Sequence, residues 1–361
     1  MSTDKSNKID LTQLVFKQID GKKETNRFWN KYHEFNESNF KELFPNDSLP
    51  GREVIQNDFI IGWVGYHSFN WVIFEDSSEE KIIARFLYSY IKKDSPAYEK
   101  NKNNSYFFII VKKDYRRQGI GSFILKSIVD KISQLDCLFT ETDTYYDSGR
   151  NFCKKFGAKL INQQSENRLY LKNVDWDLIK SWSDEISQKN PDVSLEFFTS
   201  FPEKDIEELC TLETELYAQM PSLEEGEDKW VEIISPKSRR EWEKNTKMRG
   251  QEAVTIITRE SSGIISGITE IRHSNIEQIE RLAQRTTGVK KEFRGKGLGK
   301  WLKAEMLLFI KKNLPNATYM VTGNADHNAP MNSINQRLGF KPYYQETSHK
   351  FILKELIKKL K

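Results

Sequence analysis

The sequence has few cysteines and no long hydrophobic run. Its 361 residues include only Cys137, Cys153 and Cys210, and none forms a C-x-x-C pair, so neither a disulfide framework nor a paired-cysteine metal site is indicated. The longest apolar stretches, such as FFIIV, are too short to span a membrane. The first ten residues, MSTDKSNKID, are polar and lack the apolar region of a signal peptide. We therefore expect a cytoplasmic protein.

Neither sign of charge dominates, and histidine is scarce. A net charge of +4, in a chain with 30% charged residues, indicates no broad nucleic-acid-binding surface. The hydrophobic content of 37% is that of a globular protein, and the length suffices for two domains. We expect no metal, because no ligand spacing relates the five histidines, which are His33, His67, His273, His327 and His349.

Three glycines stand where a helix is expected to begin, in KKEFRGKGLGKWLKAEM (290–306). Each glycine inside a helix costs about 1 kcal/mol relative to alanine. Apolar residues at helical spacing follow from Leu298 to Phe309, and the preceding stretch 281–289 predicts a strand. Glycine at such a junction permits positive φ and close approach of a ligand, and the first turn of a helix offers unpaired N–H groups to phosphate. The spacing matches neither the dinucleotide fingerprint nor the P-loop.

The same stretch occurs twice in the chain. Residues 111–121 read VKKDYRRQGIG and residues 289–299 read VKKEFRGKGLG, an offset of 178 (294 − 116). The first copy also follows a strand-like stretch, SYFFIIV, and precedes an apolar stripe of helical period. We predict two copies of one fold. The expected domains are residues 1–173 and 194–361, joined by a linker helix within 174–193.

The duplicated stretch resembles a known motif. Arg-x-x-Gly-x-Gly between a strand and a helix is similar to the acyl-CoA pyrophosphate motif of the GNAT acetyltransferase superfamily. The later stretch TYMVTGNADHNAPMNSINQRLGF (318–340) resembles the end of that fold, as found in tandem, mycothiol-synthase-like double GNAT proteins. The resemblance covers most of 195–353 and, more faintly, 10–172. It implies an α/β (α+β) chain of two tandem GNAT folds, each a mixed, mostly antiparallel sheet flanked by helices.

The resemblance also implies an activity. The expected reaction is acetyl-CoA-dependent transfer of an acetyl group to a primary amine, by direct attack in a ternary complex in the C-terminal domain. The alternative is a CoA-binding regulatory or scaffold protein without turnover. Acetyl-CoA would be the cosubstrate and a small-molecule or peptide amine the acceptor, with no nucleic acid, membrane or metal and a monomer or homodimer as the assembly. A small amine, an antibiotic, an amino-acid derivative and a protein N-terminus all remain open as acceptors.

In the second copy, the resemblance assigns CoA binding to the glycine turn and the strand before it. Backbone N–H groups of 295–300 would hold the pyrophosphate, and the strand end would pair with the pantetheine arm. Arg294 either pairs with a phosphate or braces the loop. Asn328 contacts the CoA arm, caps a helix, or does both. The predicted set is Thr287, Gly288, Val289, Arg294, Gly295, Lys296, Gly297, Leu298, Gly299, Lys300, Asn324 and Asn328.

The first copy keeps the phosphate motif but lacks the asparagines. Aligning Gly157 with Gly339 places Tyr146 at the Asn328 position. Cys153 then occupies the Asn335 position, where a buried helix residue is expected rather than a catalytic thiol. We therefore expect a structural or weaker CoA-binding copy without catalysis. Its predicted site consists of Val111, Arg116, Arg117, Gln118, Gly119, Ile120, Gly121 and Ser122.

The residue expected to protonate the CoA thiolate differs from the family pattern. Many members have a tyrosine as general acid where this chain has Asn335, and an amide cannot act as an acid. Tyr319, Tyr343 or a water takes that role, or the thiolate leaves unassisted. Lys300 and Lys303, on the following helix, either reach the adenosine phosphate or lie on a solvated face.

Two carboxylates are candidates for the general base. Glu270 comes first, because it shares a strand face with Ile264 and Ile268, and an apolar setting raises the pKa of a carboxyl group. Glu280, on the next strand, comes second. Either glutamate is alternatively an exposed salt-bridge residue. The acidic stretch 221–230 attracts a cationic amine or is a solvated face.

Overall fold

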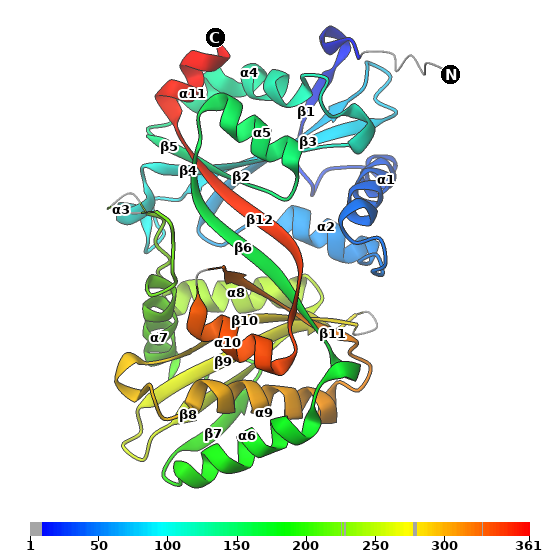
Figure 1. The fold of residues 1–361 in the computed structure, drawn as a ribbon. Helices are drawn as coiled ribbons and strands as arrows, with labels where there is room; N and C mark the ends of the chain where they lie inside the picture. The colour runs from blue at the N-terminus through cyan, green and yellow to red at the C-terminus, as the bar shows by residue number, and fades with distance from the viewer. Residues whose placement is uncertain (1–8, 225, 227–228, 277–279, 327) are drawn as a thin grey trace. The chain divides into compact units, whose positions relative to one another are not determined.

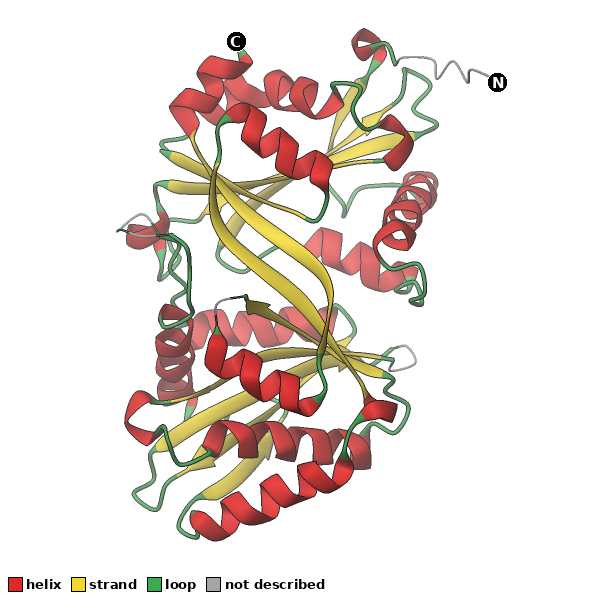
Figure 2. Cartoon of the chain, in the orientation of Figure 1, coloured by secondary structure: helices red, strands yellow, loops and turns green. Residues whose placement is uncertain are grey.

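The computed structural model describes residues 9–224, 226, 229–276, 280–326 and 328–361. The chain is a mixed α/β protein, as expected (Figures 1 and 2). Its contacts divide it into two compact units. Unit 1 comprises Met1–Ile161, Gly226–Trp230 and Ser348–Lys361, and unit 2 comprises Asn162–Glu225 and Val231–Thr347. None of the described helices combines the length and the apolar character needed to cross a membrane.

The sheet of unit 1 is mostly antiparallel. Its strands follow the order β1-β2-β3-β4-β5-β12. The pairs β1–β2, β2–β3 and β3–β4 are antiparallel, and β4 and β5 are parallel. Successive side chains of a strand point to opposite faces, and in β4 Phe107 belongs to one buried core while Ile110 packs against the other. The strands are β1 (Val15–Ile19), β2 (Tyr66–Phe74), β3 (Ile82–Ile91), β4 (Asn104–Val111), β5 (Phe139–Thr144) and the end of β12 (Lys341–Ile352).

Helices cover both faces of this sheet. The apolar stripe predicted after Gly119 is confirmed, because Ile120, Ile124, Ile128 and Ile132 are all buried. They pack on a core that also holds α5 and α11, whereas α1 and α2 pack on the opposite face. The helices are α1 (Asn26–Leu43), α2 (Arg52–Ile61), α4 (Ile120–Ser133), α5 (Asp147–Phe156) and α11 (Leu353–Leu360), with the short elements η1 (Leu11–Gln13), α3 (Tyr98–Asn101) and η2 (Lys113–Tyr115). The short turn η3 (Leu171–Asn173) belongs to unit 2.

Unit 2 repeats this plan. Its strands follow the order β6-β11-β10-β9-β8-β7, and only β10 and β11 are parallel. The helices α7 and α8 lie on one face, and α6, α9 and α10 lie on the other. The strands are β6 (Lys159–Tyr170), β7 (Ser194–Phe198), β8 (Gln251–Arg259), β9 (Ile265–Ser274), β10 (Arg281–Val289) and β11 (Tyr319–Ala325). The helices are α6 (Trp176–Lys189), α7 (Ile206–Ala218), α8 (Pro236–Met248), α9 (Leu298–Asn313) and α10 (Ala329–Leu338), with the turn η4 (Lys291–Phe293).

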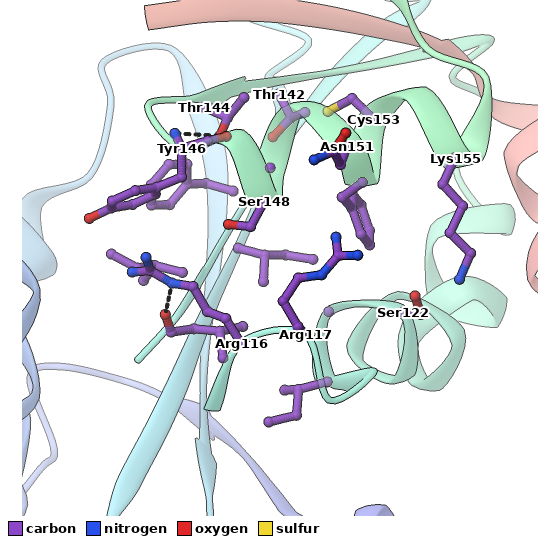
Figure 3. A pocket seen from close by; sticks show the side chains of 18 of the residues that line it. Arg116, Arg117, Ser122, Thr142, Thr144, Tyr146, Ser148, Asn151, Cys153 and Lys155 are labelled. Atoms are coloured by element: carbon purple, nitrogen blue, oxygen red, sulfur yellow. Dashed lines mark hydrogen bonds between the residues drawn. The ribbon is translucent and has the colours of Figure 1, made fainter. Parts of the chain in front are cut away.

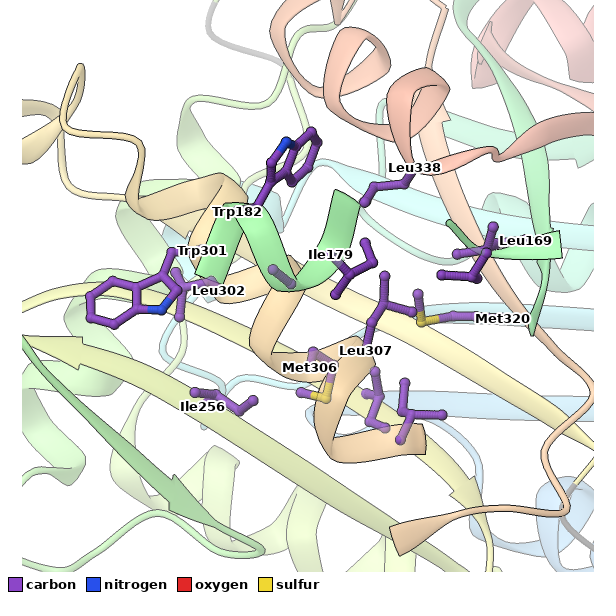
Figure 4. Close-up of a cluster of buried hydrophobic side chains, with 14 of the residues drawn as sticks. Leu169, Ile179, Trp182, Ile256, Trp301, Leu302, Met306, Leu307, Met320 and Leu338 are labelled. Atoms are coloured by element: carbon purple, nitrogen blue, oxygen red, sulfur yellow. The ribbon is translucent and has the colours of Figure 1, made fainter. Parts of the chain in front are cut away.

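The compact units differ from the predicted domain ranges at two strands and one helix. The sheet of unit 1 ends on residues 348–352 of β12, and that of unit 2 ends on residues 162–170 of β6. Helix α6, expected as a linker, is instead part of the core of unit 2. Its buried residues Ile179, Trp182 and Ile186 pack with Trp301 and other residues of α9 (Figure 4). The duplicated fold itself, with mixed and mostly antiparallel sheets, is as predicted.

Candidate active site

The two parallel strands at the centre of each unit run side by side only briefly. In unit 1, β4 pairs with β5 over Asn104–Tyr106, and among the described strands residues 107–111 have no partner on that edge. In unit 2, β10 pairs with β11 over Arg281–Ala283, and a bulge between Gln284 and Thr287 follows. Each unit therefore presents a free edge of backbone N–H and C=O groups just before its glycine turn.

The glycine turn of unit 1 holds an unusual backbone. Gly119 caps α4 with a φ of 89°, and Arg117 has a φ of 64°. A side chain in this left-handed region costs about 1–3 kcal/mol. Unit 2 avoids that cost, since its equivalent residue is Gly295 with a φ of 86°. Unit 1 thus keeps a cationic side chain at the turn despite the backbone strain.

The motif arginines brace the two turns. Each donates from Nε to the carbonyl oxygen five residues earlier, at 2.8 Å for Arg116 and 3.1 Å for Arg294. The two terminal nitrogens of Arg116 also bind both carboxylate oxygens of Glu42 at 2.7 Å. Arg294 binds the side-chain oxygen of Gln219. Of the two roles left open for Arg294, the structure shows the loop brace.

A cavity of about 360 Å³ opens between the diverging strands of unit 1 and the first turn of α4 (Figure 3). Gln118 does not line it, because its Oε1 accepts a hydrogen bond from the backbone of Ile9 at 2.9 Å. The other seven residues predicted for the first copy do: Val111, Arg116, Arg117, Gly119, Ile120, Gly121 and Ser122.

Two cations line the end of this cavity beside the first turn of α4. Arg117 and Lys155 extend into the space between α4 and α5, beside Ser122 and Asn151 (Figure 3). Neither cation has a carboxylate partner among the described residues; Lys155 lies 5.1 Å from the Phe156 ring centroid. Unpaired N–H groups at a helix N-terminus and two unpaired cations together suit a phosphate group.

A carboxylate lines the cavity at the end of β5. Asp143 Oδ2 accepts a hydrogen bond from the Tyr106 hydroxyl at 3.1 Å, and the Ser348 side chain binds the same carboxyl group. Burial raises the pKa of Asp143, although both hydrogen bonds act in the opposite direction. Burial raises the pKa of the nearby Cys153 thiol to about 12, so that this group is a thiol rather than a thiolate nucleophile.

The sequence that forms most of unit 1 matches a known family. Residues 24–158 match the model of the acetyltransferase (GNAT) family. This part of the chain is a GNAT acetyltransferase domain. The fold supports acyl transfer in general, and the pattern of parallel strands around the glycine turn repeats in unit 2.

Solved structures, among them a tandem GNAT protein, have a similar fold. A tandem GNAT protein from the clavulanic acid biosynthesis pathway aligns with a TM-score of 0.74 and 18% identity, over 94% of this chain and 99% of its own. A GCN5-related N-acetyltransferase from Sphaerobacter thermophilus aligns with a TM-score of 0.58 and 11% identity, over 94% and 96% of the two chains. A fungal GCN5-related glucosamine N-acetyltransferase region has a TM-score of 0.63 and 12% identity, over 94% of this chain and 38% of its own. No relative was found among curated sequences.

The second GNAT fold keeps the turn, with Gly295 in place of the first copy's Arg117. Gly295 and Gly297 both have a φ of 86°. Lys296 pairs with Glu260 at 3.1 Å, and its backbone oxygen accepts from Asn190 at 3.2 Å. Because the Lys296 ammonium already has a carboxylate partner, its positive charge is partly neutralised. The backbone N–H groups from the turn into α9 remain as the predicted anion site.

Two asparagines around the second site have unpaired groups. Asn328 is the N-cap of α10 and accepts from the Met331 N–H at 3.4 Å, so the capping role is present. Asn324 Nδ2 and both side-chain atoms of Asn335 are buried without a hydrogen-bond partner among the described residues. Such unpaired amides are unfavourable unless a ligand or water bonds them.

Three side chains proposed for the second site have other surroundings. Lys303 is not on a solvated face but buried in α9, 2% exposed. Tyr319 and Tyr343, considered as substitute acids, both pack against the Arg168 guanidinium, which lies 4.8 and 3.4 Å from their ring centroids. Lys300 lies 5.7 Å from the Trp182 ring centroid.

Glu270 has a different environment from the one predicted. It is fully buried in an ion network: Oε1 accepts from Arg285 Nε at 2.8 Å, and Oε2 accepts from Thr255 at 2.9 Å and from Arg239. Burial raises the pKa of Glu270, but the two arginines outweigh it and hold that pKa below its usual range. The expected rise was wrong, because it considered only the strand face. Ile264 lies outside β9 and is exposed.

The remaining candidates are Glu280 and the acidic stretch 221–230. Glu280 precedes β10, and its backbone oxygen accepts from the N–H groups of Thr318 and Tyr319 at 2.8 and 3.0 Å. Its role as a base stays a prediction. The acidic stretch 221–230 includes residues 225, 227 and 228, and the histidine set includes His327, all of which lie outside the described residues.

Sequence reasoning missed Asp143. It lies in the stretch TETDT, where every residue is polar and no hydrophobic alternation marks which side chains face the cavity. The available signal was topological: β5 follows the glycine helix, and the carboxyl ends of parallel strands in an α/β sheet border the ligand site. Lys155 was missed for a similar reason, because a lysine on a helix is usually solvated.

Proposed function

We propose that this GNAT protein transfers an acetyl group from acetyl-CoA to a primary amine, by direct attack in a ternary complex. The cavity of unit 1 is the observation that carries the proposal. It joins a free strand edge, a helix N-terminus with two unpaired cations, and a carboxylate. A scaffold without turnover would need no carboxylate in this position.

The groups around the cavity fit the parts of acetyl-CoA. The unpaired edge of β4 can bond the amides of the pantetheine arm, as an added strand does. The first N–H groups of α4, with Arg117 and Lys155, suit the phosphates. A thioester held by these contacts lies in the splay between β4 and β5, where an amine nitrogen can attack it.

Unit 2 is a second candidate site. The sequence placed catalysis in this C-terminal domain, with the cosubstrate on the 295–300 turn. The unpaired amides of Asn324 and Asn335 favour a bound ligand there. Glu270 is not carried into this proposal, because both of its oxygens are already bonded within the buried network.

A matched pair of glycine variants tests where the cosubstrate acts. The first turn of each helix has room for a β-carbon at Gly121, 3.4 Å from the Phe152 ring, and at Gly299, 3.8 Å from Val289. Both variants should therefore fold, while valine methyl groups obstruct the N–H groups that bind phosphate. We expect Gly121→Val to lower turnover at least tenfold and to weaken acetyl-CoA binding, and Gly299→Val to retain most turnover. Calorimetry and thiol release measure the two effects.

The opposite pattern would return catalysis to the C-terminal domain. Loss of turnover in Gly299→Val alone, with Gly121→Val active, would identify unit 1 as a structural copy. Circular dichroism of both variants checks that the fold is intact.

A further inference from the structure

Asp143 faces the side of the sheet that carries α1 and α2. In β5, Thr140, Thr142 and Thr144 are buried on one face, so Asp143 points to the other. Tyr106, which donates to Asp143, shares its β4 face with Ile110, which packs against the α1 and α2 core. The carboxylate therefore lines the cavity from the face opposite α4 and α5.

An exposed tryptophan packs beside this carboxylate. Trp63 is 45% exposed, and its ring centroid lies 5.1 Å from that of Tyr106 and 6.2 Å from that of Tyr66. Two glycines in the left-handed region, Gly62 and Gly65, bracket it with φ values of 65° and 79°. The exposed part of the Trp63 ring is therefore an apolar surface next to the phenol that bonds Asp143.

We propose that unit 1 binds its acceptor against Trp63 and Tyr106, and that Asp143 takes a proton from the amine. The acceptor is a primary ammonium group carried on a flat, apolar group. The faces of the two aromatic rings attract the cation and its apolar carrier, and the carboxylate attracts the ammonium. This inference rests on the proposed function, since it needs acetyl-CoA in the unit 1 cavity.

The proton balance of the step is complete. The ammonium R–NH3+ gives one proton to the Asp143 carboxylate, and the freed nitrogen lone pair forms the bond to the thioester carbon. The carbon–sulfur bond then breaks, and the departing thiolate takes a second proton from the nitrogen. The products are the amide and CoA-SH, with the first proton released from Asp143 to water.

Compared with the neighbouring titratable groups, Asp143 is the one that can accept this proton. Tyr106 donates to Asp143, and burial keeps Cys153 protonated. Glu141, on the same strand face, is paired with Lys350 at 3.1 Å. The raised pKa of Asp143 brings it closer to the working range of a general base, in contrast to Glu270.

Asp143→Asn tests the base in the full chain. The expected result is a fall in turnover of about 10²- to 10⁴-fold with phenethylamine, and unchanged acetyl-CoA affinity by calorimetry. The wild-type rate should rise with pH through one ionisation, and the variant should lack that limb. A variant that keeps more than about a tenth of the wild-type rate would overturn the base assignment.

Tyr106→Phe provides a test that does not depend on removing the carboxylate. Loss of a hydrogen bond that favours the charged form raises the pKa of Asp143, so the limb should move to higher pH. An unmoved limb contradicts the inference.

Trp63→Ala should reduce the preference for phenethylamine over ethylamine by about tenfold, and an unchanged preference would overturn the acceptor class. A wild-type chain that releases no more thiol with any amine than without one would instead overturn the proposed function, and this inference with it.

Discussion

Replacing Arg239 by methionine should lower the free energy of unfolding of unit 2 by about 3–5 kcal/mol. The Arg239 side chain is 3% exposed and pairs with Glu213 at 3.3 Å and with Glu270. It also lies 4.4 Å from the Trp242 ring centroid. Methionine fills much of the volume but removes the ion-pair partner of the buried Glu213. Burial already raises the pKa of Glu213 to about 7, even with the arginine present.

Lys244→Met is the matched control, since it removes the same charge from an exposed position of α8. An exposed substitution of this kind changes stability by about 0.5 kcal/mol or less. Urea denaturation followed by circular dichroism measures both variants. Equal midpoints for the two variants would show that the buried ion network does not hold unit 2 together.

This network shows why the surroundings of Glu270 were hard to predict. Its strand face was read correctly as buried, but the two cations come from elsewhere in the sequence. Arg239 lies 31 residues earlier in α8, and Arg285 lies 15 residues later in β10. A prediction from one strand includes only the burial of Glu270, which raises its pKa. It does not include the helix that packs on the strand and lowers that pKa.

The repeat predicted the backbone of the site better than its chemistry. Glycine turns, strands and helix starts follow from local propensity, so seven of the eight residues assigned to the first copy line one cavity. The proposal of a site in unit 1 did not follow from the repeat, because it rests on Asp143 and on contacts between distant strands. The same limit applies to β6 and β12, which are the last strands of two equivalent folds. Their sequence patterns do not show which sheet each strand completes, because this depends on packing.

The position of Lys303 gives the other large expected effect. The offset of 178 places it opposite Leu125, which is buried in α4 (303 − 178 = 125). Unit 2 therefore has an amine where unit 1 has an apolar side chain. Among the described residues Lys303 has no carboxylate partner; the Phe340 ring centroid lies 5.4 Å from its Nζ. Burial lowers the pKa of the Lys303 amine to about 7.

This shift makes the stability of unit 2 depend on pH. Between pH 10 and 7 the unfolded chain binds a proton at Lys303 and the folded chain does not, so stability should fall as the pH falls. The loss at pH 7 is about 4 kcal/mol relative to high pH, and it levels off below the folded pKa, where both states are protonated. Lys303→Met removes the titrating group and preserves the length of the side chain. We expect it to raise the free energy of unfolding at pH 7 by about 2–4 kcal/mol and to flatten the pH dependence.

Lys312→Met, on the exposed side of the same helix, separates burial from charge. It removes an identical ammonium group without desolvation, so stability should change by about 0.5 kcal/mol or less, and the slope between pH 7 and 10 should remain. Urea denaturation at pH 7 and at pH 10 measures both variants. The gain for Lys303→Met should be several kcal/mol larger at pH 7 than at pH 10, because pH 10 lies close to the pKa of lysine in the unfolded chain, where the difference in proton binding between the two states is nearly lost. If the Lys303→Met chain is instead less stable than the wild type at pH 7, the charged amine must have a stabilising partner in the folded state. The lysine would then stabilise the core, contrary to the expectation from its burial.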